Sequence, residues 1–226
     1  MIAPLEAPAH CRADRFLAWA AALDESAPPP STRPRAASIA LAPLRRRRAR
    51  RLAAAGPLLL QLGCDSRYTD GWIRASPGDG ERADLRWDLS RPLPLPPGSV
   101  DSIFHEHLLE RFSYAQGVAL HRRCLAVLRP GGVLRIRVVD VGAALQGYAM
   151  TSAGDAGEWP TAMARVACLT ADPSRHALYD AETLELSCVA AGFPRADQIG
   201  SGEAGPQSGA GSGGHGEPCL YVEATA

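Results

Sequence analysis

The stretch that decides the fold lies between Ser99 and Val141 and reads SVDSIF, a polar turn, SYAQGVALHRRCLAVL, RPGG and VLRIRVVDV. The first apolar run predicts a short buried strand. Ser113 and Gln116 then stand three residues apart, which is the spacing of a capping box and predicts the start of a helix. RPGG ends that helix, and the β-branched residues after it predict a second buried strand. The stretch is therefore a strand–helix–strand unit.

The same alternation continues on both sides of this unit. LLLQL at 58–62, closed by Gly63, predicts another buried strand. Asp180 and Gly192 stand where the N-terminal and C-terminal caps of a helix belong, and residues 219–224 predict a last strand. Such alternation is typical of an α/β fold, here a doubly wound, mostly parallel sheet with helices on both faces.

Ligands of open α/β sheets bind beyond the carboxyl ends of the strands, near the point where the strand order reverses. This rule places residues 63–67 and 105–107 at one edge of the predicted sheet. Gly63 follows a buried strand directly, and a glycine there lets the backbone approach a ligand closely. His105 and His107 are candidates for a general base at the same edge. A backbone contact at the start of a helix is the alternative role for His107.

The chain divides at residue 56 into two predicted parts. Residues 1–56 form an N-terminal helical extension, with a helix over 12–24 that carries Phe16 and Trp19. These two side chains pack the helix on the body of the protein or on a protein partner. Residues 57–226 hold the α/β domain. Residues 26–37 are predicted to be a linker and residues 200–217 a mobile loop, whereas the pattern of residues 142–176 is less regular.

Charge separates the two parts, although the 24 basic and 24 acidic residues balance to a net charge of zero. The balance excludes a wholly basic nucleic-acid coat and an acidic disordered chain. Residues 26–64 contain Arg but no acidic residue, so a basic segment precedes a mildly acidic body. The cluster Arg45–Arg51 could contact phosphate, RNA or an anionic membrane. A solvated helix face is the favoured interpretation, because no aromatic residues are interleaved, and nucleic acid is not an expected partner.

Compartment and metal content follow from what the sequence lacks. No apolar run reaches the roughly 18 residues that span a bilayer, and the N-terminus lacks the pattern of a signal peptide. The six Cys have irregular spacings without a CxxC pair, which favours buried free thiols over disulfides or a zinc site. We therefore expect a cytoplasmic protein with no membrane span and no metal.

Several short motifs, in this order along residues 57–226, resemble class I S-adenosylmethionine-dependent methyltransferases. More narrowly, the chain resembles a bacterial subgroup of predicted methyltransferases linked to cell-surface glycan synthesis. The most specific of these motifs are LRPGG before a strand and AGF near the end of the chain. The matching residues are 62–64, 71–73, 88–89, 92–94, 99–103, 107–110, 127–136, His176, 179–180, Leu184, 191–193 and 221–224.

This resemblance implies a seven-stranded, Rossmann-like sheet with an inserted antiparallel last strand, S-adenosylmethionine as cofactor and a small-molecule or glycan-like acceptor, methylated at oxygen. Gly63 and Cys64 fall on the turn that wraps the methionine part of the cofactor, and residues 88–89 fall where adenine is contacted. His105 and Glu106 fall beside the methyl-transfer site. The implied cofactor-binding set is Gln61, Gly63, Cys64, Asp65, Ser76, Asp88, Leu89, His105 and Glu106, and the implied catalytic pair is His105 and His107.

Two positions depart from the family pattern. Asp65 replaces a glycine, and its carboxylate could repel the carboxylate of the cofactor. Ser76 stands where an acidic residue normally bonds the ribose, although Asp79 or Glu81 could substitute. The alternative hypothesis is therefore a methyltransferase-like binding or scaffolding protein that has lost catalysis.

Overall fold

The computed structural model of the 226-residue chain describes residues 9–24, 47, 51, 56–63, 71–76, 83–150, 160–171, 173–200 and 218–226. Its elements are α1 (Ala9–Asp24), β1 (Leu59–Leu62), β2 (Trp72–Ser76), β3 (Leu85–Arg86), β4 (Val100–Glu106), η1 (Leu109–Arg111), α4 (Tyr114–Leu125), β5 (Leu128–Val139), α5 (Val141–Met150), α6 (Ala162–Ala171), α7 (Ala181–Ala191), β6 (Arg195–Gln198) and β7 (Cys219–Thr225).

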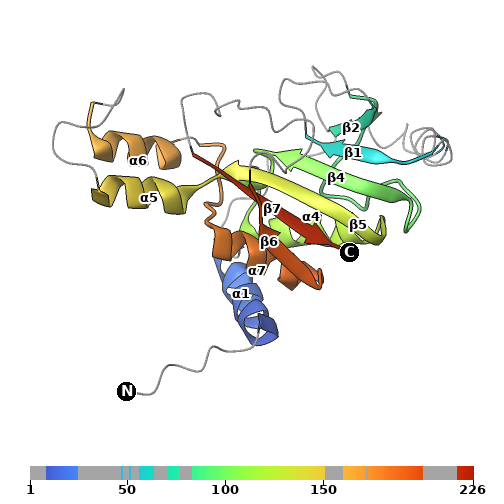
Figure 1. Cartoon of the computed structure of the whole chain (residues 1–226), viewed down its shortest axis with the longest axis horizontal. Helices are drawn as coiled ribbons and strands as arrows, with labels where there is room; N and C mark the ends of the chain where they lie inside the picture. Colours follow the sequence, from blue (N-terminus) through green and yellow to red (C-terminus); the bar gives the residue numbers. More distant parts are fainter. Residues whose placement is uncertain are drawn as a thin grey trace.

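The strands form one seven-stranded sheet in the order β3-β2-β1-β4-β5-β7-β6 (Figure 1). β1 pairs in parallel with both β2 and β4, and β4 pairs in parallel with β5. β7 is antiparallel to both of its neighbours, β5 and β6. The predicted mostly parallel α/β sheet with an inserted antiparallel last strand is therefore confirmed.

Side-chain hydrogen bonds fix the ends of the predicted helices. The Ser113 hydroxyl accepts from the backbone N–H of Gln116, and the Gln116 side chain accepts from the N–H of Ser113, so the capping box is present. Asp180 accepts from the N–H of Thr183 at the start of α7, and Gly192 ends that helix with a φ of 109°. Polar residues at helix ends satisfy backbone N–H groups that have no partner within the helix.

Asp101 holds the amino ends of two strands together. Its Oδ2 accepts from the N–H of Leu58 at 2.7 Å, and its Oδ1 lies 2.6 Å from the Arg129 Nε. Because Leu58 precedes β1 and Arg129 lies near the start of β5, one carboxylate on β4 aligns three neighbouring strands. A Pro-rich loop at residues 91–98 leads into this point.

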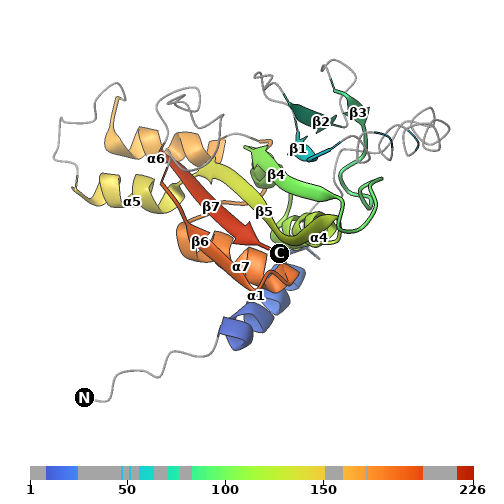
Figure 2. The same ribbon diagram turned by 45° about the vertical axis from the view of Figure 1, so that its right-hand side comes forward.

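The two faces of the sheet differ in chemistry. One face carries apolar side chains such as Leu62 and Ile136, and α4 and α7 cover it (Figure 2). The other face carries charged side chains beside apolar ones: Arg135 of β5 stands in register with Phe104 of β4, and Arg137 with Glu106. Alternate residues of a strand point to opposite faces, so Glu106, Arg135 and Arg137 share this face.

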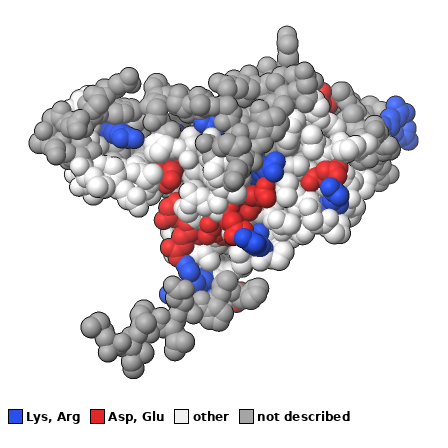
Figure 3. All heavy atoms as spheres, viewed as in Figure 1, with Lys and Arg blue, Asp and Glu red and all other residues white. Residues whose placement is uncertain are grey.

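The described part of the N-terminal extension packs on the α/β body. Phe16 and Ala20 of α1 are buried, and the Phe16 ring meets Tyr114 of α4 edge-on at 6.0 Å. Arg12 forms an ion pair with Glu182 of α7. Acidic side chains gather on this surface over α7 and β6 (Figure 3). Trp19 stays 46% exposed, so a protein partner at α1 remains a prediction.

The structure differs from the sequence expectations in three segments. RPGG lies within β5, which begins at Leu128, because the Gly131 N–H reaches the carbonyl of Ala226 across the sheet. Residues 142–176, predicted to be irregular, contain most of α5 and the whole of α6. β6 was not predicted, because its sequence RADQ has no apolar alternation. Most of the segments 26–37 and 200–217, and of Arg45–Arg51, lies outside the described residues.

Neither a membrane-spanning helix nor a disulfide occurs among the described residues. No helix among them has the length and apolarity needed to cross a membrane. The five cysteines in the described ranges form no disulfide, and only Cys124 and Cys188 are buried. The expectation of buried thiols is therefore wrong for Cys11, which is exposed, and for Cys168 and Cys219, which are partly exposed.

Candidate active site at the carboxyl edge of the sheet

The strand order reverses between β1 and β4, and the candidate site lies at the carboxyl ends of these strands. From β1 the chain proceeds outward to β2 and β3, and from β4 it proceeds the other way to β5. In open α/β sheets, ligands bind at such a reversal of the strand order. Leu62 and His105 stand side by side in the parallel register just before this edge.

Gly63 follows β1 at the reversal point and has a backbone that favours glycine. Its φ is +73°, and its N–H donates to the carbonyl of Ala75 at 2.9 Å. An added Cβ would lie 3.3 Å from the Cδ1 of Leu108, closer than ordinary van der Waals contact. Side chains are strained in this conformation, so the position suits a close approach by a ligand.

Three more of the predicted cofactor-binding residues follow the neighbouring strands. Ser76 ends β2 and is buried, and its carbonyl accepts from the N–H of Trp87. Asp88 stands two residues after β3, and its Oδ1 accepts from the Ser90 N–H at 3.0 Å and from the Ser90 hydroxyl at 2.7 Å. Leu89 beside it is buried.

The remaining predicted cofactor-binding residues are less informative. Gln61 is buried within β1, on the polar face of the sheet and in register with Arg74. Cys64 and Asp65 lie outside the described residues, as do Asp79 and Glu81. The structure thus gathers Gly63, Ser76 and Asp88 at the ends of adjacent strands, on the β3-β2-β1 half of the edge.

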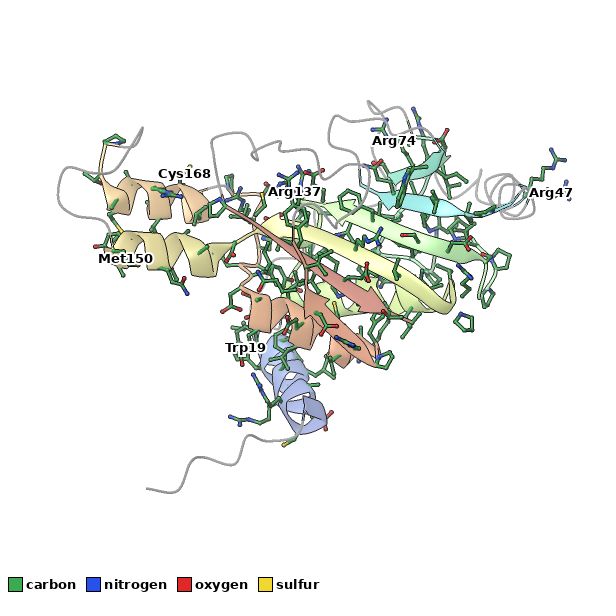
Figure 4. The ribbon with its side chains drawn as sticks, viewed as in Figure 1. Trp19, Arg47, Arg74, Arg137, Met150 and Cys168 are labelled. Carbon is green, nitrogen blue, oxygen red and sulfur yellow. The ribbon has the colours of Figure 1, made fainter. Side chains whose placement is uncertain are left out.

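The other half of the edge carries five polar residues that we call the rim cluster: Glu106, His107, Glu110, Arg137 and Cys219. They come from β4, from the turn after it, from η1, from β5 and from the start of β7. Because β7 is antiparallel to β5, its first residue lies at the edge where β5 ends, and Cys219 pairs with Val139. Figure 4 shows Arg137 near the end of β5.

The Glu110 carboxylate connects His107 of the rim cluster to the end of β5. Its side chain is only 4% exposed, and its Oε1 accepts from the N–H of Val139 at 2.8 Å. The Nδ1 of His107 lies 3.4 Å from the Oε2 of Glu110. A carboxylate with both oxygens engaged fixes the orientation of the imidazole ring.

His107 leaves the strand with a φ of +47°, and its N–H donates to the carbonyl of Arg137 at 3.0 Å. Burial opposes a charge on the ring, but interactions with Cys219 and Glu110 outweigh it and raise the pKa of His107 to about 10. The ring is therefore an imidazolium at neutral pH and acts as a proton donor.

Arg137 is buried and connects the acidic and sulfur groups of the cluster. Its Nη1 pairs with the Oε1 of Glu106, and its Nη2 lies 3.2 Å from the Sγ of Cys219. The guanidinium also lies over the Tyr221 ring, 5.5 Å from the centroid. Burial opposes the charge, yet the interactions with Cys219 and Glu106 raise the pKa of Arg137.

His105, the other predicted base, faces away from the rim cluster. It is fully buried on the apolar face of the sheet, stacked on His121 of α4 with ring centroids 5.6 Å apart. Neither of its ring nitrogens has a hydrogen-bond partner among the described residues. Burial, with a contribution from His121, holds the pKa of His105 well below its ordinary value. The structure therefore brings His107 and Glu106 together but separates His105 from them.

Sequence reasoning missed three members of the rim cluster. Glu110 lies in the matching motif at residues 107–110, but the resemblance implies no role for it. Arg137 stands within an apolar strand, and only the alternation of its neighbours signals that it faces the polar side. Cys219 opens the last strand, and nothing local in the sequence shows that this end meets the end of β5. No group of three or more His, Cys, Asp or Glu in the described ranges could hold a metal ion.

No family model and no curated protein matches the chain. Among solved structures, it is similar to a SAM dependent methyltransferase from Archaeoglobus fulgidus, at 14% identity and a TM-score of 0.47 over 82% of this chain and 94% of that one. An S-adenosylmethionine dependent methyltransferase from Mesorhizobium loti gives 15% identity and a TM-score of 0.47, over 81% and 96%. A possible exported protein from Bordetella parapertussis gives 14% and 0.44, over 81% of this chain and 66% of that chain.

Proposed function

We propose that the chain is a class I S-adenosylmethionine-dependent methyltransferase that methylates an oxygen of a small-molecule or glycan-like acceptor. The observation that carries this proposal is the division of the carboxyl edge at the reversal point. Gly63, Ser76 and Asp88 stand on one half, and the charged rim cluster stands on the other. One half suits a cofactor and the other a polar acceptor, with the two meeting between β1 and β4.

The described residues of the cofactor half fit S-adenosylmethionine. Gly63 has no side chain to obstruct a ligand, and its backbone favours glycine. Asp88 uses Oδ1 for Ser90, and a carboxylate retains further lone pairs that can accept from an adenine amino group. The bound cofactor supplies an electrophilic methyl group on a sulfonium. The roles of Cys64 and Asp65 stay predictions from sequence.

On the acceptor half, His107 and Glu106 act as a donor and an acceptor. The protonated His107 donates to an acceptor oxygen and orients it, since Glu110 holds the ring in place. Glu106, whose side chain is 18% exposed, takes the proton that the hydroxyl releases. Methyl transfer depends mainly on positioning, which a rigid cluster on three strands and a short helix favours. His105 has no part in this proposal, because its ring is fully buried.

Isothermal titration calorimetry with S-adenosylmethionine and S-adenosylhomocysteine tests the proposal. Gly63→Ala places a Cβ at the reversal point and should weaken binding by at least about tenfold, or 1.4 kcal/mol. Gly131→Ala is the matched control, because Gly131 has the same φ of +73° and nothing within 4 Å of an added Cβ. Both variants should lose about 1–2 kcal/mol of stability from backbone strain, and Gly63→Ala should lose more because its Cβ crowds Leu108, but only Gly63→Ala should lose binding.

Two results would contradict the proposal. If the wild-type chain binds neither compound at millimolar concentration, the alternative of a binding or scaffolding protein without cofactor chemistry takes its place. If Gly63→Ala and Gly131→Ala bind equally well, the cofactor does not lie at Gly63.

A further inference from the structure

Cys219 differs from the other described cysteines in its electrostatic surroundings. Cys124 and Cys188 are buried in the core, and burial raises the pKa of both thiols, that of Cys124 to about 12. Cys219 is partly exposed and lies at the carboxyl edge of the sheet, at the start of β7. Cys11 on α1 is exposed and serves as a reference thiol.

Two cationic side chains approach the Cys219 sulfur from different elements. Arg137 of β5 places its Nη2 3.2 Å from the Sγ. His107, in the turn after β4, also interacts with Cys219, and this interaction helps to keep the imidazole protonated. Cations beside a thiol stabilise the thiolate, which is the nucleophilic form.

The anionic groups near Cys219 are held by the same cations. Glu106 pairs with Arg137, and Glu110 accepts from His107 and from the backbone of β5. Tyr221, the next residue of β7 on the same face, lies under the Arg137 guanidinium, and burial raises the pKa of its hydroxyl, which keeps it neutral. Arg137 and His107 therefore face the sulfur as well as the two carboxylates.

We propose that Cys219 is a reactive thiolate, held by Arg137 and His107, and a site of covalent modification by hydrogen peroxide. The sulfur attacks one peroxide oxygen, an S–O bond forms as the O–O bond breaks, and hydroxide leaves. The sulfur is oxidised by two electrons to a sulfenic acid, and the peroxide is reduced. Such thiols are partly exposed and have low pKa values. The inference is independent of methyl transfer, because it needs neither cofactor nor acceptor.

The first test compares two cysteines within the wild-type chain. Alkylation by iodoacetamide is followed for each cysteine by peptide mass mapping between pH 5 and pH 10. Cys219 should reach half of its maximal rate at least one pH unit below Cys11. A midpoint one pH unit lower gives about tenfold more thiolate at pH values below both midpoints. Lower intrinsic nucleophilicity reduces this advantage to about threefold in rate. A midpoint equal to or above that of Cys11 would overturn the proposal.

Variants then test the cause, with folding checked by circular dichroism. Arg137→Gln should move the Cys219 midpoint upward, and Arg137→Lys, which keeps a positive charge, should move it less. If Arg137→Gln does not fold, His107→Gln provides the same test from the other cation. Treatment with hydrogen peroxide and trapping with dimedone should label the Cys219 peptide ahead of the Cys11 peptide. Labelling of Cys11 without Cys219 would refute the oxidation step.

Discussion

The buried pair of His105 and His121 contrasts with the rim cluster around His107. His105 has no exposed surface and stacks on another histidine, and its pKa is lowered. His107, two residues further on, meets Glu110 and Cys219, and its pKa is raised to about 10. Of these two imidazoles, which are close in sequence, the His105 ring is thus neutral at neutral pH and the His107 ring is cationic. Burial without a partner favours the neutral ring, whereas burial beside anionic groups favours the cation.

The largest expected effect comes from removing the carboxylate that holds His107. Glu110→Ala takes away the acceptor of the Val139 N–H and the anion that faces the imidazolium. Loss of one partner of a buried ion pair costs about 3–5 kcal/mol, so the free energy of unfolding should fall by that amount. Urea denaturation followed by circular dichroism measures it.

Glu110→Gln is the matched control for this variant, because it keeps an oxygen acceptor and removes only the charge. It should be less destabilised than Glu110→Ala while also lowering the pKa of His107. A Glu110→Ala protein within 1 kcal/mol of wild type would show that the ion pair does not hold the rim together.

A smaller effect is expected from protonating the core pair in acid. Burial lowers the pKa of His121 to about 4, whereas an unfolded histidine titrates near 6.5. The unfolded state therefore binds more protons below pH 6.5, and stability falls as the pH drops from 6.5 toward 4. For His121 the loss is about 3 kcal/mol, since each pKa unit corresponds to about 1.4 kcal/mol, and His105 adds to it.

His105→Leu should reduce this acid loss and leave stability at pH 7 equal or higher, because two buried nitrogens without hydrogen-bond partners disappear. His176→Leu is the control, since His176 is exposed and should leave the pH profile unchanged. Thermal unfolding at pH 4.5 and pH 7 measures both variants. An unchanged acid loss in His105→Leu would mean that the core pair is not its source.

The sequence predicted the sheet well, because buried strands and helix caps carry local signals. The capping box at Ser113 and Gln116 and the caps at Asp180 and Gly192 are all present. These signals depend on residues three to twelve positions apart and need no tertiary contact. The sequence of β6 carries no such local signal, because this strand forms through antiparallel pairing with β7.

The candidate site was less predictable than the fold. Strand alternation treats His105 and His107 as equivalent, because residues two apart in a strand point to the same face. The positive φ of His107 ends this equivalence and directs the His107 ring toward the other residues of the rim cluster. Cys219 and Arg137 are 82 residues apart and meet only because β7 runs antiparallel to β5.

The most direct test of this account is a pH titration of the histidine ring protons by NMR, with signals assigned by His105→Leu and His107→Gln. His107 should stay protonated from pH 5 to pH 9, and His105 should titrate well below pH 6.5. Two separate titrations would show that the imidazolium lies in the rim cluster and that the buried His105 ring is neutral. If both rings instead titrate together near pH 6.5, the rim cluster does not hold an imidazolium, and the proposed donor role of His107 is wrong.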